Sequence, residues 1–214
     1  MAIDFHTHTF HPGVTELVSI PAPAAAGAAT LVDDAGHFRS LEYHPWQLPA
    51  EFLPPQPPPE ELLAQFDALG EIGLDRLRGP ALPVQLCYLK LLLSAARRAG
   101  KPVVIHCVRC DAELLGLISR EPNRFLIHGF RGGPRRLAAL LDAGFTVSLA
   151  PFAWTTPGVP ELLRARRAAR IGLETDDRQD TDIARLTANA ADDLRIPELP
   201  EILDANFHHF LTAK

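Results

Sequence analysis

Two histidines near the start of the chain are spaced so that both can bind one metal ion. His6 and His8 are two residues apart in MAIDFHTHTF. In a β-strand such residues face the same side, about 7 Å apart, whereas in a helix they point in nearly opposite directions. Ile3 and Phe5 alternate with Asp4 and the histidines, which is the period of a strand. The spacing therefore permits a shared ion, and further ligands must come from elsewhere in the chain.

The same arrangement recurs at four other places. Short apolar runs end in metal-binding residue types in ALGEIGLD, KPVVIHC, RFLIHGF and RIGLETDD. The candidate ligands, with the first two, are His6, His8, Glu71, His106, His128 and Asp176. Four imidazoles and two carboxylates suit Zn²⁺, Mn²⁺ or related ions, and they exceed what one four-coordinate zinc requires. We therefore predict two divalent metal ions (Zn, Mn or Mg), about 3.5–4 Å apart.

Helical patterns separate these short runs. PVQLCYLKLLLSAARRAGKP carries apolar residues at helical spacing before a glycine, and GGPRRLAALLDAGF has a proline in its first turn and ends at Gly144. Alternating strands and helices favour a parallel sheet with the helices outside. We predict an α/β fold, a TIM-type (β/α) barrel forming one domain over residues 1–214. Its active site would lie at the carboxyl ends of the strands, where all six candidates fall.

The barrel is predicted to be abbreviated in its N-terminal units. Only a short connector separates ELVSI from ATLVDD, where a regular barrel would carry its first two helices. The proline-rich segment LPAEFLPPQPPPE is expected to form an ordered loop that leads into a helix at Glu60–Leu69.

Composition narrows the function classes. The net charge of −5 argues against coating by nucleic acid, and no apolar run reaches the roughly 18 residues of a membrane span. Three cysteines (Cys87, Cys107 and Cys110) suit a reducing compartment, and the pair at 107 and 110 lacks a second pair for a structural zinc. We expect a cytoplasmic protein with no membrane partner and no obligatory protein partner.

Five ordered segments resemble the TatD family of metal-dependent hydrolases. They are DFHTH, GEIGLD, PVVIHC, IHGF and LETDD, and the closing EILDANFHHF is similar to the terminal helix of that family. The resemblance runs from residue 3 to about 210. It implies a TIM-barrel hydrolase of phosphoester bonds, a deoxyribonuclease or phosphodiesterase, in which two metal ions activate a water molecule. The expected substrate is a small phosphoester or a DNA end.

The resemblance also implies roles for the six candidates. The first ion would be bound by His6, His8 and Asp176; the second by His106 and His128; and Glu71 would bridge the two. Asp176 and Glu71 are the expected catalytic groups. If RIGLETDD ends a strand, adjacent side chains alternate in direction, which selects Asp176 over Asp177.

Three further residues are expected to bind substrate. EYHPWQL is similar to the His-Pro loop of the family and places His44 at the mouth of the pocket, while Arg109 and Arg131 would face a phosphate. The chain departs from the family where His106 is followed by Cys-Val-Arg-Cys instead of Ser-Arg-Asp, and where ETDD replaces ETDSP. These departures and the short N-terminal units indicate a reshaped substrate pocket.

Three alternatives stay open at this point. DFHTHT also matches the opening of PHP-type phosphoesterases, although GEIGLD and LETDD fit them poorly. An amidohydrolase-type lactonase or deaminase could use the same barrel, but its bridging lysine has no candidate, because Lys90 and Lys101 lie in or after a predicted helix. A non-catalytic barrel scaffold would have no chemical reason to keep all six ligands.

Overall fold

The structure, a computed structural model, describes residues 2–22, 36–49, 56–119, 121 and 123–212. Its contacts divide these residues into two compact units. The terminal unit takes its residues from 1–18, 33–38 and 126–214, and the central unit takes its residues from 19–32 and 39–125. The single barrel domain over residues 1–214 stays a prediction.

The terminal unit is built on parallel strands. They are β1 (Ile3–Thr7), the first part of β2 (Thr15–Pro21), β6 (Phe125–Phe130), β7 (Thr146–Leu149) and β8 (Ile171–Leu173). β1 pairs with β2, β6 with β7, and β7 with β8, each in parallel. A bridge between Thr7 and Asp176 joins the end of β1 to the segment after β8. The carboxyl ends of β1 and β8 therefore meet at one edge.

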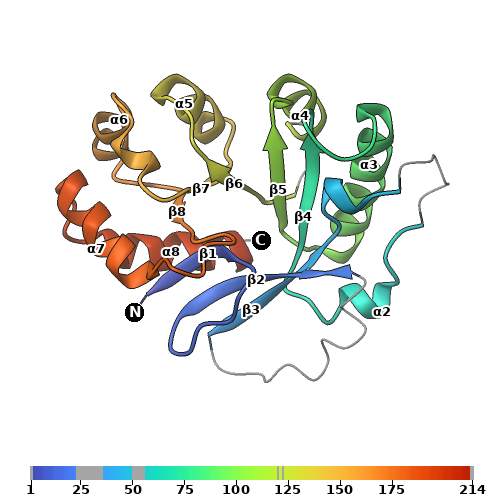
Figure 1. Cartoon of the computed structure of the whole chain (residues 1–214), viewed down its shortest axis with the longest axis horizontal. Helices are drawn as coiled ribbons and strands as arrows, with labels where there is room; N and C mark the ends of the chain where they lie inside the picture. Colours follow the sequence, from blue (N-terminus) through green and yellow to red (C-terminus); the bar gives the residue numbers. More distant parts are fainter. Residues whose placement is uncertain (1, 23–35, 50–55, 120, 122, 213–214) are drawn as a thin grey trace. The chain divides into compact units, whose positions relative to one another are not determined.

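Helices pack against these strands and against one another (Figure 1). They are α5 (Pro134–Asp142), α6 (Val159–Ala165), α7 (Ile183–Leu194) and α8 (Leu199–Thr212), with a 3-10 turn, η3 (Ala153–Thr155). Phe5 of β1 meets Phe207 of α8 edge to face, with ring centroids 5.2 Å apart. A Cβ on Gly172 would lie 2.3 Å from the Phe5 ring, so only glycine fits there. Phe5 therefore packs between α8 on one side and Gly172 of β8 on the other.

In the central unit strands and helices alternate along the chain. β3 (His37–Glu42), whose residues from 39 onward belong here, pairs in parallel with β4 (Ala68–Asp75), and β4 pairs with β5 (Val103–Val108). The helices are η2 (Pro45–Gln47, a 3-10 turn), α2 (Glu60–Leu63), α3 (Leu82–Ala99) and α4 (Asp111–Ile118). In Figure 1 α3 and α4 stand beside β4 and β5.

The five strands and two helices expected from the patterns are present. ALGEIGLD forms β4 residue for residue, and the helix expected in PVQLCYLKLLLSAARRAGKP is α3. Gly100 follows α3 in the left-handed region, with φ 65°, where glycine is the favoured residue. The last of the five strands is shorter than expected: β8 ends at Leu173, so Glu174 and Asp176 follow it rather than belong to it.

Other elements differ from the expectation. The patterns do not indicate β2, β3 or β7, because polar residues interrupt the apolar run in each of them. The helix expected over Glu60–Leu69 is wrong beyond Leu63, since Leu69 already pairs with Val103 in the sheet. Between β1 and β2 the described residues form no helix, as an abbreviated barrel requires.

Two expectations fall on residues outside the described part of the chain. These are most of the connector between ELVSI and ATLVDD, residues 23–28, and the middle of the proline-rich loop, residues 50–55. Among the helices that the structure describes, none combines the length and apolar character needed to cross a bilayer.

Candidate metal centre

His6 and His8 converge on Asp176 in the terminal unit. The two imidazole rings lie 5.1 Å apart, and the Nε2 atoms of His6 and His8 are 3.8 and 3.6 Å from Oδ1 of Asp176. The His6 side chain is fully buried, whereas those of His8 and Asp176 are 31% and 33% exposed. Three donor groups thus face one point that solvent can reach.

Backbone hydrogen bonds fix the position of Asp176. Its N–H donates to the His6 carbonyl (3.0 Å), and its own carbonyl accepts from the His8 N–H (3.2 Å). Asp176 adopts the left-handed conformation, with φ 59°. The direction of its side chain is therefore set by this turn and not by alternation along a strand, which corrects the reasoning that selected it. Asp177 is exposed.

A second donor group in the terminal unit contains His128, Glu174 and Asp176. One ligand atom from each lies within 4.8 Å of the others. Nδ1 of His128 is 3.6 Å from Oε1 of Glu174, which is fully buried and accepts hydrogen bonds from the Gly129 N–H (2.6 Å) and the Ser148 hydroxyl. The terminal unit therefore gathers His6, His8, His128 and Asp176, all four of its predicted ligands.

Asp4 ties β1 to the segment that carries Asp176. Oδ1 of Asp4 accepts the N–H groups of Thr175 (3.1 Å) and His6 (3.2 Å), and Oδ2 lies 2.6 Å from the Thr175 hydroxyl. Burial raises the pKa of Asp4 to about 8, although the hydrogen bond with the Thr175 hydroxyl opposes this. The Asp4 carboxyl therefore joins the two segments through its hydrogen bonds with Thr175.

The central unit contributes a third donor group, made of His44, Glu71 and His106. Oε2 of Glu71 lies 3.2 Å from Nδ1 of His106 and 3.5 Å from Nε2 of His44. The two imidazole rings are 4.5 Å apart, and all three side chains are largely buried. His44 thus stands among the candidate ligands themselves, where the sequence indicated a place at the mouth of the pocket.

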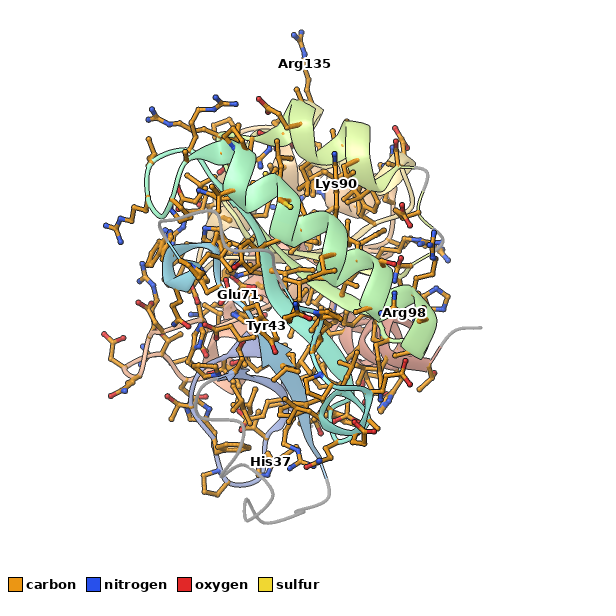
Figure 2. The ribbon with its side chains drawn as sticks, turned by 90° about the vertical axis from the view of Figure 1, so that its right-hand side faces the viewer. His37, Tyr43, Glu71, Lys90, Arg98 and Arg135 are labelled. Atoms are coloured by element: carbon orange, nitrogen blue, oxygen red, sulfur yellow. The ribbon has the colours of Figure 1, made fainter. Side chains whose placement is uncertain are left out.

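Two glycines bring Glu71 this close to His106. A Cβ on Gly70 would lie 2.3 Å from the Val104 carbonyl oxygen, and one on Gly73 would lie 1.9 Å from that of His106. Both glycines have positive φ angles, 138° and 154°. The GEIG segment therefore lets β4 approach β5 more closely than side chains would allow. Figure 2 views this unit from the side of α3, with Lys90 and Arg98 on the exposed side of that helix.

Asp75 holds the other nitrogen of His106. Its Oδ2 is 3.2 Å from Nε2 of His106 and accepts the Trp46 indole N–H (2.6 Å). Its Oδ1 accepts the backbone N–H groups of Leu77 (2.7 Å) and Arg78 (3.1 Å). Burial alone would raise the pKa of Asp75, but the hydrogen bonds from Trp46, Leu77 and His106 outweigh it and lower that pKa. An ionised carboxylate that orients a ligand imidazole is a common support of metal sites.

The arginines expected to bind substrate lie at the surface. Arg109, just after β5, and Arg131, just after β6, are both exposed. The Arg109 carbonyl accepts a hydrogen bond from the Arg76 guanidinium (3.0 Å). Cys107 and Cys110 are free thiols, and burial raises the pKa of Cys110.

Three carboxyl groups of the site are absent from the ligand set drawn from the sequence. They are Asp4, Asp75 and Glu174. Asp4 and Asp75 lie inside the segments DFHTH and GEIGLD, so the motifs contain the signal, but only the fold shows which groups they contact. Glu174 stands beside Asp176 in LETDD, and its contact with His128 is set by the fold.

The donor chemistry of both units fits transition-metal ions. Each unit offers a group of imidazole and carboxylate donors with mutual distances below 4.8 Å, the ligand mixture that Zn²⁺ and similar ions take. In the central unit the second nitrogen of His106 is also held by a carboxylate. The residues present therefore fit a divalent cation.

Comparison with known proteins supports the same chemistry. A family model described as TatD related DNase matches residues 28–193. A curated relative, the uncharacterized metal-dependent hydrolase TatD of Mycobacterium tuberculosis strain H37Rv, is 27% identical over 178 residues, which cover 69% of this chain and 67% of the relative.

Two solved structures share the fold. YjjV, a TatD homologue from Escherichia coli K12, has a TM-score of 0.76 at 22% identity, and a TatD family hydrolase from Entamoeba histolytica has 0.71 at 12%. Each match covers 100% of this chain and 98% of the other. They confirm the predicted fold class, an α/β barrel of the TIM type. Together with the family match, which spans most of the sequence, they lead to one conclusion: the chain belongs to the TatD family of metal-dependent hydrolases.

Proposed function

We propose that this hydrolase cleaves phosphoester bonds in a small phosphodiester or at the end of a DNA chain. The observation that carries the proposal is that imidazole and carboxylate donors form groups in each unit. Their number exceeds what one four-coordinate ion requires. The family description, TatD related DNase, supports the same class of substrate.

The proposed ligands follow the assignment made from the sequence. His6, His8 and Asp176 bind one ion, His106 and His128 bind a second, and Glu71 bridges the two. Four imidazoles favour Zn²⁺ or Mn²⁺ over Mg²⁺. When bound, such a pair of ions lowers the pKa of a water molecule and neutralises charge on the phosphate.

Asp176 is the proposed proton acceptor. It is a third exposed, so it can meet both a bound ion and the attacking water. Positive charge nearby keeps a carboxylate ionised, and an ionised Asp176 can take the proton of that water. The exposed guanidiniums of Arg109 and Arg131 can hold phosphate oxygens by charge-assisted hydrogen bonds. His44, which lies beside Glu71, is the third proposed substrate-binding residue.

A reducing, cytoplasmic location is part of the proposal. All three cysteines are free thiols, which is common in that compartment. No obligatory protein partner is invoked.

The test is hydrolysis of a substrate panel by purified protein supplied with Zn²⁺, Mn²⁺ or Mg²⁺. The panel contains a chromogenic phosphodiester, a DNA oligonucleotide, a phosphate monoester, a lactone and an amide. We expect turnover of the phosphodiester and release of nucleotides from the DNA. Cleavage of the lactone or amide alone would replace the proposal by an amidohydrolase activity, and cleavage of the monoester alone by a PHP-type activity. No turnover of any member would indicate a scaffold.

Metal analysis tests the ligand assignment separately. Replacing His6 and His8 together by alanine should remove one of two bound ions per chain and leave the circular dichroism spectrum unchanged. The same stoichiometry in wild type and double variant would exclude these residues as ligands. Binding should also weaken below about pH 6, because protonated imidazoles do not bind metal.

A further inference from the structure

Exposed apolar side chains occur where strands end. Among the described residues the large ones are Trp46 (45% exposed), Leu77 (59%) and Phe152 (55%). Trp46 follows β3, Leu77 follows β4, and Phe152 follows β7. In a parallel barrel the carboxyl ends of the strands form the face that carries the active site. In the central unit, Trp46 and Leu77 thus lie in loops that follow the strands bearing its candidate ligands.

Trp46 is held rigidly beside the donor group of the central unit. Its indole N–H donates to Oδ2 of Asp75 (2.6 Å), and its backbone N–H donates to Nδ1 of His44 (3.1 Å). Its ring meets His44 edge to face at 4.6 Å and lies 5.8 Å from His106. The polar edge of the indole is therefore turned toward the site, although nearly half of the residue remains open to solvent.

The guanidinium of Arg78 lies over the ring of Trp46. The guanidinium carbon lies 4.5 Å from the centre of the indole ring, a cation–π contact. The backbone of Arg78 is fixed on both sides, because its N–H donates to Asp75 (3.1 Å) and its carbonyl accepts from Gln85 (3.1 Å). The side chain is exposed. An aromatic plane and a cation therefore stand next to candidate metal ligands.

We propose that Trp46 and Arg78 bind a nucleobase and its phosphate next to the scissile bond, so that the enzyme prefers nucleotide esters over phosphodiesters without a base. The proposal rests on the proposed function and adds a specificity site to it. Bases stack on exposed aromatic rings with little dependence on sequence, and an arginine adds charge to such a platform. Because Asp75 anchors the indole, the platform is formed before the substrate arrives.

Two substrates with the same leaving group test this preference. Thymidine 5′-(4-nitrophenyl phosphate) carries a base, and methyl 4-nitrophenyl phosphate does not. We expect wild type to have a higher kcat/KM for the thymidine ester, chiefly through a lower KM. The ratio of the two kcat/KM values should fall about 5- to 100-fold in Trp46→Leu, and about two- to fivefold in Arg78→Ala. Taking the ratio removes any effect of the lost Asp75 hydrogen bond on chemistry common to both substrates.

Two variants control for these changes. Trp46→Phe keeps an aromatic face and should retain most of the preference. Arg135→Ala removes an exposed arginine of α5, which projects into solvent in Figure 2, and should leave both rates unchanged.

A binding measurement separates this inference from the proposed function. The chain has two tryptophans, of which Trp154 is fully buried, so Trp46 should dominate any fluorescence response to a ligand. With the protein in chelator, dithymidine monophosphate should quench this fluorescence in a saturable way, and Trp46→Phe should abolish the response.

The outcomes differ for the two proposals. Quenching without hydrolysis of either ester would retain the base site and overturn the phosphodiesterase. Hydrolysis with an unchanged substrate ratio in Trp46→Leu, or with no quenching, would overturn the base site and retain the phosphodiesterase.

Discussion

The two units hold their candidate ligands in different ways. In the central unit His106 is fixed by carboxylates at both nitrogens, and Asp75 is itself held by the Trp46 indole and two backbone N–H groups. In the terminal unit Asp176 is placed by backbone hydrogen bonds to the end of β1, and its carboxylate stays a third exposed. His106 is thus held by side chains, whereas Asp176 is placed by the main chain and is open to water.

From this difference we expect His106 and Asp176 to serve different roles. A braced imidazole keeps its geometry without a ligand, which favours tight metal binding. An exposed carboxylate beside His8 can exchange contacts with water and substrate during turnover. Variants at His106 and Asp75 should therefore act mainly on metal affinity, and variants at Asp176 mainly on rate.

The largest effect is expected at Asp176. Asparagine has nearly the same shape but is neutral and a poor base, so Asp176→Asn should lower phosphodiester turnover by about 10²–10⁴-fold. The neighbouring Asp177→Asn is the matched control, because its side chain is exposed and should matter far less. Turnover is measured with metal content checked in each variant. An inactive Asp177→Asn beside an active Asp176→Asn would reverse the assignment.

Asp75→Asn tests how the support of His106 in the central unit affects metal binding. Loss of the charge behind His106 should weaken metal binding by about 10–100-fold while kcat at saturating metal changes little. Titration with Zn²⁺ or Mn²⁺ against a competing chelator measures the affinity. The control is Asp192→Asn, an exposed residue of α7. A large loss of kcat with unchanged metal affinity would show that the two units do not divide these tasks.

Asp4→Asn tests the connection inside the terminal unit through its pH dependence. The folded pKa of Asp4 is raised to about 8, above the value of the unfolded chain, so its contribution to stability is lost as pH rises between about 4 and 8. Asparagine cannot ionise and removes this slope. The free energy of unfolding of the variant should therefore increase relative to that of wild type as pH rises, by up to about 1.4 kcal/mol per pH unit.

Urea denaturation of metal-free protein from pH 5 to pH 9 measures this gain. The difference between variant and wild type should level off above about pH 8. A difference independent of pH would mean that Asp4 is ionised in the folded protein.

The smallest effect concerns salt. Contact through one or two arginines predicts that log(kcat/KM) for DNA falls with log[salt] by a slope of about −1 to −2. Arg109→Ala and Arg131→Ala remove one candidate from the central unit and one from the terminal unit. The variant whose slope is reduced by about 1 identifies the unit that holds the phosphate. A slope near −6 would show an extended basic surface instead.

The positions of the ligand-bearing strands could be predicted because each carries two signals, an apolar run and a polar residue at its end. β4 was predictable over its full length from ALGEIGLD. β7, which reads TVSL, carries no such end residue, and β2 and β3 contain charged residues that hide their burial. Glu16, for example, is fully buried because His11 and His37 surround its carboxylate, a contact that no local pattern encodes.

The candidate ligands were predictable as residue types, but the contacts of their supports were not. His106 ends an apolar run, so its position indicates a ligand. Asp75 contacts a nitrogen of His106 because of the register of β4 against β5, in which Gly73 pairs with His106. Asp176 has a positive φ although it is not glycine, and no residue pattern in RIGLETDD predicts that turn.

The division into units has a consequence for the order of synthesis. The donors of the central unit, His44, Glu71 and His106, lie within one uninterrupted stretch that leaves the ribosome early. Those of the terminal unit come from distant parts of the chain: Asp4 and Thr175, which join them, are 171 residues apart in sequence. The donors of the terminal unit therefore cannot assemble until the segment after β8 has been made, so the donors of the central unit are synthesised well before the residues proposed to activate water are complete.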